Sequence, residues 1–233
     1  MLNKKKLVKN VFDSVFEKYD IMNDIMSLGI HRIWKKIAVS MYYPKDNDSI
    51  LDLACGTGDI SELIINKKKN INITLADINI NMLNFCKKKL FNKGFIKNIN
   101  FVQTNGEYLP FKNKSFDCIT IGFGLRNFSN IKLSLKSLYK ILKKNGKLII
   151  LEFSHPNNKL IYTLYDIYSY NIIPKIGKII CNDENSYKYL VNSIRAHPNQ
   201  SELMKLINEA GFKKVNFTNI SNGIVAIHSA IKI

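Results

Sequence analysis

The sequence of 233 residues has no cysteine pair at Cys-x-x-Cys spacing, little arginine and no long apolar run. Its four cysteines, Cys55, Cys86, Cys118 and Cys181, are scattered, which argues against a metal site or a disulfide framework. Charged residues interrupt every window of about 18 residues, so no membrane-spanning helix is expected. The basic N-terminus lacks the apolar core of a secretory leader. We therefore expect a cytoplasmic protein with reduced thiols and no bound metal.

The net charge of +17 is compatible with a nucleic-acid or anionic-membrane partner. Lysine is spread along the whole chain, however, and asparagine and isoleucine are also abundant, which is typical of an AT-rich genome. We interpret the charge as compositional drift, with weak affinity for an anionic bilayer as the functional alternative. Arg32, Arg126 and Arg195 are exceptions to the lysine bias, which indicates sites that need the planar guanidinium group.

The apolar pattern predicts an α/β protein. Residues 8–42 have helical spacing, with a break predicted at Gly29, and strands then alternate with helices. Strands are predicted at 49–54, 71–77, 99–104, 116–123, 147–153, 214–220 and 223–233, and helices at 60–67, 81–93, 131–144 and 200–210. This alternation predicts a mostly parallel sheet of seven strands covered on both faces. The short connection between the last two strands suits a hairpin, so the final strand should be antiparallel.

The length suits one domain over residues 1–233, and no linker rich in proline or serine divides it. Residues 1–45 are expected to form an N-terminal helical cap, and residues 49–155 a cofactor-binding core. Residues 156–198 hold six tyrosines and interrupt the alternation, so we expect a substrate or lid insertion there. Residues 199–233 are expected to supply the closing helix and strands.

The stretch ILDLACGTGDI, residues 50–60, ends an apolar strand in a glycine-rich turn and begins a helix. Its Gly-Thr-Gly sequence matches the start of the dinucleotide-binding pattern Gly-x-Gly-x-x-Gly, but the third glycine position is Ser61. Asp77 follows about 20 residues later, where a dinucleotide fold places the acid that binds ribose. The turn therefore predicts either a nicotinamide cofactor or S-adenosylmethionine.

Charge favours S-adenosylmethionine over a dinucleotide. Asp59 follows the turn at the N-terminal end of the next helix, where its carboxylate would repel a pyrophosphate. Asp52, in the preceding strand, adds negative charge that suits the sulfonium and ammonium groups of adenosylmethionine. Asp77 can bind the ribose hydroxyls, and Asn105 with Gly106 can bond the edge of the adenine ring.

The segment GFGLRNF, residues 122–128, ends the fourth predicted strand and is a candidate acceptor site. Its two phenylalanines beside Arg126 and Asn127 form a setting for a flat, oxygenated ring. Arg126 can stabilise a developing phenolate and Asn127 can orient the same oxygen, with a structural role for Arg126 as the alternative. No Asn-Pro-Pro-aromatic element occurs and Cys118 lies within a strand, which argues against methylation of nucleic-acid bases.

These segments together resemble the UbiE/COQ5 family of quinone-biosynthesis C-methyltransferases. YDIMNDIMSLGIHRIWK (19–35) is similar to the N-terminal signature of the family, and LDLACGTGD, LADIN, FDCITIGFGLRN and LEFS are similar to its core. NDENSYKYLVNSIRAHPNQ (182–200) is similar to its C-terminal portion. The likeness runs from about residue 11 to the end. It implies the class I, Rossmann-like fold of methyltransferases that depend on S-adenosylmethionine, with an N-terminal helical cap and a helical insertion.

The resemblance and the glycine turn together imply a set of cofactor contacts. These are Asp52, Gly56, Thr57, Gly58, Asp77, Asn105, Gly106 and Gly122. Gly122 stands where relatives carry serine, Gly106 where many carry alanine, and Cys55 where many carry glycine. None of these departures removes an obvious chemical group, so the resemblance implies an active enzyme that releases S-adenosylhomocysteine.

The implied reaction is C-methylation of a reduced, polyprenylated quinol in ubiquinone or menaquinone biosynthesis, with 2-methoxy-6-polyprenyl-1,4-benzoquinol and demethylmenaquinol as acceptors. A ring carbon is a poor nucleophile without an electron-donating hydroxyl, so we expect the quinol rather than the quinone. Tyr19 and Asp20 are candidates for a lid over the cofactor. His31, Arg195 and His197 are candidates for shaping the active site, and a structural role explains each equally well.

The tyrosine-rich segment 156–190 is expected to form the wall that receives the polyprenyl tail, with a satellite apolar core as the alternative. Nearby lysines predict peripheral contact with an anionic bilayer, and other quinone-biosynthesis enzymes and an oligomer are further candidate partners. No nucleic-acid partner is expected. The competing functions are a nicotinamide-linked oxidoreductase and a basic RNA-binding protein or RNA methyltransferase.

Overall fold

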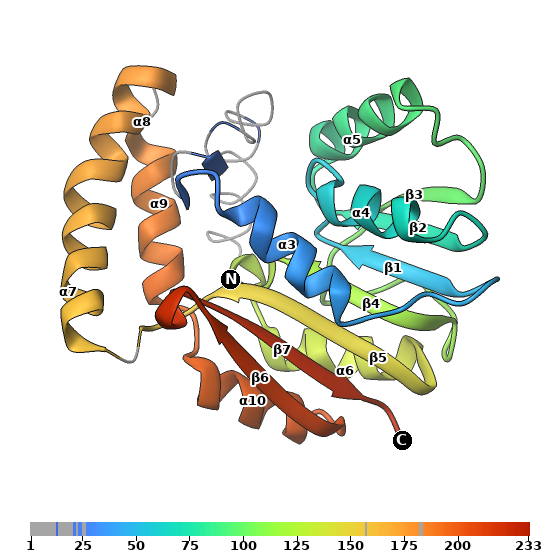
Figure 1. Cartoon of the computed structure of the whole chain (residues 1–233). Helices are drawn as coiled ribbons and strands as arrows, with labels where there is room; N and C mark the ends of the chain where they lie inside the picture. Colours follow the sequence, from blue (N-terminus) through green and yellow to red (C-terminus); the bar gives the residue numbers. More distant parts are fainter. Residues whose placement is uncertain (1–12, 14–20, 22, 25–26, 157, 182–183) are drawn as a thin grey trace.

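A computed structural model describes residues 13, 21, 23–24, 27–156, 158–181 and 184–233 of the chain. At its centre is a seven-stranded sheet in the order β3-β2-β1-β4-β5-β7-β6 (Figure 1). The strands are β1 (Ser49–Leu53), β2 (Asn72–Asp77), β3 (Ile99–Gln103), β4 (Phe116–Gly122), β5 (Leu142–Phe153), β6 (Lys213–Ile220) and β7 (Val225–Ile231). Strands β1 to β5 are parallel, and β7 pairs antiparallel with both β5 and β6. The predicted sheet, with its antiparallel last strand, is confirmed.

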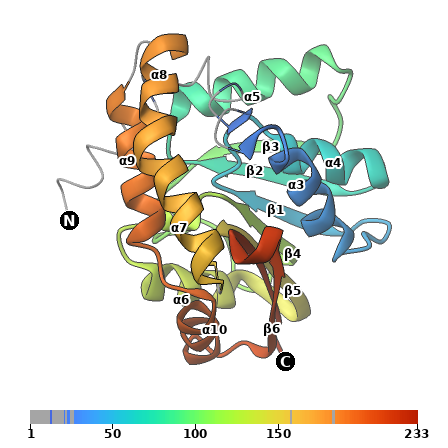
Figure 2. The same ribbon diagram turned by 60° about the vertical axis from the view of Figure 1, so that its left-hand side comes forward.

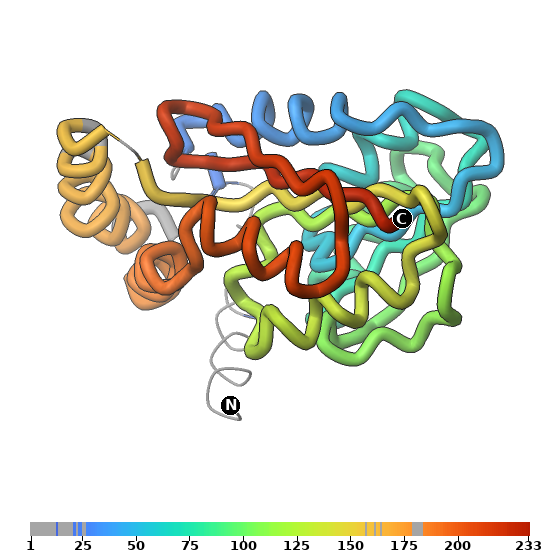
Figure 3. The backbone as a smooth tube through the Cα atoms, turned by 90° about the horizontal axis from the view of Figure 1, so that it is seen from below, coloured from blue at the N-terminus to red at the C-terminus, as the bar shows by residue number. Residues whose placement is uncertain are grey.

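Helices cover both faces of the sheet and form two separate apolar cores. One face carries α3 (His31–Ser40), α4 (Asp59–Lys67) and α5 (Ile80–Asn92), and the other carries α6 (Ile131–Ile141) and α10 (Gln200–Glu209). Figure 3 shows these layers edge on, with α3 on one side of the strands and α6 and α10 on the other. Because the central strands are buried on both faces, their sequences are continuous apolar runs instead of alternating ones.

Asparagine side chains begin three of these helices. Asn79 accepts hydrogen bonds from two backbone amides of α5, and Asn130 accepts one from α6. Asn199 forms a reciprocal capping box with Glu202 at the start of α10. Caps of this kind are each worth about 1 kcal/mol. Those of α5 and α6 fix where the chain turns into a helix after β2 and after β4.

The helix α6 is shorter than predicted. We expected it to continue to residue 144 and stop at Asn145 and Gly146, but it ends at Ile141. The chain from Leu142 instead pairs with Phe116 of β4, and the Asn-Gly turn forms an irregularity within β5 before the ladder resumes. Leu142 is fully buried, so apolar burial on the sheet outweighs the helical periodicity at this point.

The insertion is helical and lies beyond the end of β5. It consists of α7 (Lys159–Ile167), a π-helical turn η3 (Tyr168–Ile172), α8 (Ile173–Cys181) and α9 (Glu184–Arg195). Figure 2 shows these helices standing together beyond the carboxyl edge of the sheet. Gly177 permits the close approach of α8 and α9, because a Cβ atom there would lie 2.3 Å from the buried ring of Tyr187.

Arg195 holds the insertion together. Its guanidinium carbon lies 5.0, 5.3 and 5.9 Å from the ring centroids of Tyr162, Tyr165 and Tyr170, and an amino group of Arg195 pairs with Asp166. Stacking of a cation on several rings suits the planar guanidinium better than an ammonium group. The exception to the lysine bias at this position therefore has a structural cause.

The helix α3 docks on the sheet next to the loop that follows β4. Its Trp34 ring lies 6.2 Å from that of Phe123 and 6.1 Å from that of Phe153, and the indole donates a 2.9 Å hydrogen bond to Ser221. The chain turns at residues 28–30 just before α3, and Gly29 has a φ of 77°, so the predicted break is confirmed. None of the helices that the structure describes is long and apolar enough to cross a bilayer.

Candidate functional site

Two cavities meet where β1 and β4 end, next to the glycine turn. Both are lined by Ala54, Gly56 and Phe123. Ala54 and Phe123 each have a φ of 55°, a left-handed conformation that costs free energy in residues other than glycine. This position, between the two central strands where the strand order reverses, is where open α/β sheets bind ligands.

The first cavity is placed to hold an adenosine group. Asp77, Asn105 and Gly106 line it, as predicted for the cofactor. The buried Asp77 carboxylate accepts 2.9 Å hydrogen bonds from the amides of Gly56 and Asn79, so its position is fixed. Burial raises the pKa of Asp77, and these amide bonds act against the rise. A carboxylate held at the end of β2 retains acceptor capacity for two ribose hydroxyls.

Glycine at position 106 is explained by close packing. A Cβ atom there would lie 2.5 Å from the ring of Phe128, which lines the same cavity. The buried Glu107 accepts hydrogen bonds from the amides of Ser129 and Asn130, which ties this segment to the loop after β4. Alanine at position 106 would not fit against this Phe128 ring without movement.

The second cavity is lined by Asp52, Thr57, Gly122 and Lys35. Asp52 is fully buried and accepts hydrogen bonds from the Ser61 hydroxyl at 2.6 Å and from the Thr120 hydroxyl at 2.9 Å. Burial raises the pKa of Asp52 to about 6, although both hydroxyls stabilise the charged form. Ser61, which breaks the dinucleotide pattern, therefore has a purpose: it supports a buried carboxylate.

Gly58 shapes the turn without lining either cavity. Its φ of 81° is left-handed, and a Cβ atom there would lie 2.4 Å from the sulfur of Cys86. Gly58 thus allows the turn to enter α4 directly beneath α5. Cys55 is half-buried at the second cavity, and its pKa is raised by a hydrogen bond with Cys86 and by burial, so the thiol stays protonated.

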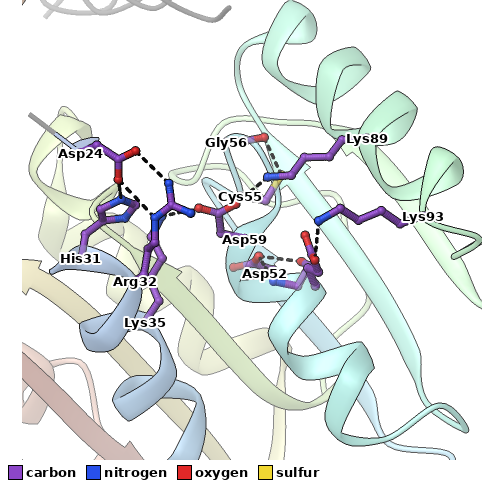
Figure 4. A network of polar contacts seen from close by, with 12 residues as sticks. Asp24, His31, Arg32, Lys35, Asp52, Cys55, Gly56, Asp59, Lys89 and Lys93 are labelled. Carbon is purple, nitrogen blue, oxygen red and sulfur yellow. Dashed lines mark hydrogen bonds and ion pairs between the residues drawn. The ribbon is translucent and has the colours of Figure 1, made fainter. Parts of the chain in front are cut away.

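The charge of Asp59 is compensated, which corrects one step of the sequence argument. We treated this carboxylate as a free negative charge, but it accepts hydrogen bonds from Lys35 at 2.7 Å and from Lys89 at 2.6 Å (Figure 4). Burial acts to raise the pKa of Asp59, and the two ammonium groups outweigh it and lower the pKa. Asp59 therefore holds two cations in place and does not itself present a negative field.

Gly122 leaves room for a neighbour from α4. A Cβ atom at this position would lie 2.2 Å from the Cδ1 atom of Ile60. A side chain at residue 122, such as the serine that the family resemblance implies for relatives, would require this Cδ1 atom to move. Because glycine has no side chain, any cofactor contact at residue 122 is made by the backbone.

Arg126 and Asn127, the predicted acceptor residues, lie in a short 3-10 turn η2 (Leu125–Asn127) but face different surroundings. The buried Arg126 guanidinium donates a 2.8 Å hydrogen bond to Glu152 and another to the carbonyl of Phe123. Asn127 lines the first cavity, and its side-chain carbonyl accepts a 2.9 Å hydrogen bond from Tyr189 of α9. Arg126 fixes the loop after β4, while Asn127 joins this loop to the insertion.

A separate groove of about 480 Å³ lies between η2 and α9 and is lined by Arg126, Tyr189 and His197. Neither ring nitrogen of His197 has a hydrogen-bond partner in the part of the chain that the structure describes. Burial lowers the pKa of His197 to about 4, so the imidazole is neutral at pH 7. His31 lies elsewhere, on α3, and its ring bonds to Asp24 at 2.9 Å.

The sequence did not predict the roles of three site residues: Lys35, Ser61 and Glu107. Lys35 follows Trp34 in the N-terminal signature, and Ser61 was noted only as a mismatch to the dinucleotide pattern. The predicted lid residues Tyr19 and Asp20 lie outside the described residues. In the described part of the chain, no group of three or more His, Cys, Asp or Glu side chains could hold a metal ion.

Comparison with known proteins places this site in context. The chain matches the model of the ubiE/COQ5 methyltransferase family over residues 1–232. It is 49% identical over 232 residues to a Haemophilus ducreyi protein named ubiquinone/menaquinone biosynthesis C-methyltransferase UbiE, covering 98% of this chain and 89% of the relative. A Pectobacterium atrosepticum protein of the same name is 48% identical, and the match covers 98% of this chain and 92% of that relative.

Solved structures share the fold at low sequence identity. A SAM-dependent methyltransferase from Aquifex aeolicus superposes with a TM-score of 0.66 at 14% identity, covering 94% of this chain and 98% of that one. The [4+2]-cyclase SpnF superposes with a TM-score of 0.71 at 12% identity, covering 97% of this chain and 95% of that one. Because a cyclase shares the architecture, the fold alone does not determine the reaction.

The contact between Gly122 and Ile60 is testable by a double-mutant cycle. We expect Gly122→Ala to lower the free energy of unfolding by about 1–3 kcal/mol, because the new methyl overlaps the Ile60 Cδ1 atom. Ile60→Val deletes that atom, so the same substitution in this background should cost at least about 1 kcal/mol less. Urea denaturation of the four proteins measures both values, and equal losses in the two backgrounds would contradict the packing explanation.

The buried Asp52 carboxylate should make stability depend on pH. Its pKa is raised to about 6 in the folded chain, so the folded state binds a proton more tightly than the unfolded chain does. Stability from this group is present below about pH 4 and is lost as the pH rises to about 6, by up to about 3 kcal/mol.

Asp52→Asn removes this titration. The difference in unfolding free energy between wild type and Asp52→Asn should therefore change by up to about 3 kcal/mol between pH 4 and pH 7, in favour of the variant at the higher pH. Chemical denaturation at several pH values measures the difference, and a constant difference would contradict it. We expect the same variant to bind adenosylmethionine about tenfold more weakly at pH 7.

Proposed function

Because the chain belongs to the ubiE/COQ5 methyltransferase family, we propose that it methylates a ring carbon of a reduced, polyprenylated quinol in ubiquinone or menaquinone biosynthesis. The names of the relatives support this assignment. The observation that carries it is the junction of two cavities at Gly56, which brings the cofactor residues and the loop of Asn127 to one place. The enzyme is thus a methyltransferase that depends on S-adenosylmethionine.

The residues that line the cavities fit S-adenosylmethionine. Asp77 would bind the ribose hydroxyls, and Asn105 with the Gly106 amide would bond the adenine edge. Asp52 would face the ammonium group of the amino-acid end, and Gly56 lets the backbone approach the cofactor at the junction. When bound, this cofactor supplies an electrophilic methyl group and a neutral thioether as the leaving group. The chain itself needs mainly to align the acceptor and exclude water.

The acceptor would bind against the loop after β4. The Asn127 carbonyl oxygen is engaged by Tyr189, which directs the amide so that its Nδ2 group remains a donor. Among the described residues, no acceptor contacts this Nδ2 group, and it lies at the cavity that takes the cofactor. It would bond the ring oxygen that becomes negative as the carbon attacks. Arg126 would add positive charge close by, although its ion pair with Glu152 offsets much of it.

The insertion would take the polyprenyl tail and touch the membrane that holds the substrate. Several of its large apolar side chains are exposed: Leu160, Ile167, Tyr170 and Ile172. Lys159 lies next to Leu160 in α7, and Lys175 and Lys178 lie in α8, which follows η3 directly. Exposed apolar side chains with lysines close by in the chain suit the boundary of an anionic bilayer. We propose that the enzyme works as a peripheral protein at the inner face of the membrane. Other quinone-biosynthesis enzymes and a second copy of the chain are candidate partners, and nucleic acid is not.

The reaction can be tested with labelled S-adenosylmethionine and short-tailed acceptors. Benzoquinol and naphthoquinol substrates should each be supplied reduced and oxidised. We expect label in the reduced rings alone, because a ring hydroxyl must donate electrons to the attacking carbon. Equal labelling of oxidised rings would contradict the mechanism. Absence of label in every ring, with adenosylmethionine bound, would contradict the proposed acceptor.

Asn127 and Tyr189 allow a matched comparison. Asn127→Leu removes the proposed donor to the acceptor oxygen, so kcat should fall about 100-fold. Tyr189→Phe keeps the amide and loses only the hydroxyl that orients it, so kcat should fall by about tenfold or less. Calorimetric affinity for adenosylhomocysteine should change less than about threefold in both variants. A larger loss of kcat in Tyr189→Phe than in Asn127→Leu would exclude the proposed role of the amide.

A further inference from the structure

Lys35 is a buried lysine that the family resemblance assigns to no ligand. It lies on α3, 7% of its surface is exposed, and it lines the second cavity with Asp52 and Thr57. A cap helix thereby brings an ammonium group to the glycine turn from outside the sheet. Figure 4 shows its side chain reaching from α3 towards Asp59.

The ammonium group of Lys35 can donate more hydrogen bonds than it makes to the described residues. It can donate three hydrogen bonds, and among the described residues only Asp59 accepts one, at 2.7 Å. A buried charged group with unused donors costs free energy unless a further acceptor is present. Lys35 borders the cavity, so a group bound there can supply this further acceptor.

The carboxylates around Lys35 do not use up its hydrogen-bond donors. Asp59 is shared between the ammonium groups of Lys35 at 2.7 Å and Lys89 at 2.6 Å. Asp52, on the same cavity, accepts its hydrogen bonds from Ser61 and Thr120, and Lys35 acts on it through opposite charge alone. A carboxylate bound in the cavity would therefore meet an ammonium group that can still donate to it.

We propose that Lys35 binds the α-carboxylate of the amino-acid end of S-adenosylmethionine. The inference rests on the proposed cofactor site and names the group that recognises one part of the cofactor. It gives the second cavity two opposite contacts, with Lys35 for the carboxylate and Asp52 for the ammonium group. It also makes α3 part of the cofactor site, so that the cap helix and the cofactor are held by the same ion pairs.

A purely structural role for Lys35 accounts for less of the geometry. An ion pair that only joined α3 to α4 would not require a buried lysine. Trp34 already docks α3 through its contacts with the two neighbouring phenylalanine rings and its hydrogen bond to Ser221. Lys93 shows what a structural pair looks like here: it joins α5 to Glu62 of α4 at 2.6 Å, its side chain is 46% exposed, and it lines neither cavity. It is therefore the matched control.

The test compares S-adenosylmethionine with its decarboxylated form, which keeps the amine and the adenosine group. Calorimetry without an acceptor measures both affinities, and no turnover is needed. We expect the wild type to bind adenosylmethionine about 10- to 100-fold more tightly than the decarboxylated form. Lys35→Met should abolish this preference by weakening adenosylmethionine alone. Lys35→Arg should retain part of the preference, and Lys93→Met should retain all of it.

The outcomes separate this inference from the proposed function. Equal affinity of the wild type for the two forms would overturn the role of Lys35 while leaving the cofactor site intact. An equal loss of affinity for both ligands in Lys35→Met would also overturn the inference, because that result is what a structural role of Lys35 predicts. Failure of the wild type to bind either form would overturn the proposed function and the inference with it. If Lys35→Met does not fold, the wild-type and Lys35→Arg preferences still decide the question.

Discussion

A single buried carboxylate, that of Asp52, connects the parts of the proposed cofactor site. It lies in the central strand β1 and accepts hydrogen bonds from Ser61 in α4 and Thr120 in β4. Strand, helix and neighbouring strand therefore meet at one charged group, and the glycine turn between β1 and α4 has its two ends fixed. Burying this charge costs stability, as its raised pKa indicates. Functional sites commonly retain such costs because they pre-organise binding.

The cap helix α3 depends on the same arrangement. Its tryptophan packs on the loop after β4 while the next residue, Lys35, reaches Asp59 beside the turn. Asp24 in turn bonds His31 and Arg32, which ties Asp24 to the start of α3. The helix α3 thus contacts the proposed cofactor site through packing and charge, and the exposed Arg32 has a structural role as a partner of Asp24.

Much of the fold was predictable because its signals are local. Apolar strands, the glycine turn and the short hairpin each lie within a few consecutive residues. The charge state of Asp59 was not predictable in this way, since its partners Lys35 and Lys89 are 24 and 30 residues distant. The reason for Gly122 also lies in another element, at Ile60. The predicted end of α6 was wrong for the same kind of reason, because the pairing of Leu142 with Phe116 of β4 overrides the helical spacing. The roles of Arg126 and Asn127 stay predictions.

The insertion is connected to the loop after β4, which borders the proposed cofactor cavity. Glu152 at the end of β5 holds Arg126, and Tyr189 of α9 holds Asn127, so the loop is fixed from two sides. An acceptor whose tail lies against the insertion is therefore positioned relative to the same loop that borders the cofactor cavity. In-line transfer of a methyl group requires little chemistry from the protein but close control of position. Coupling of the insertion helices to this loop would supply that control for the proposed acceptor.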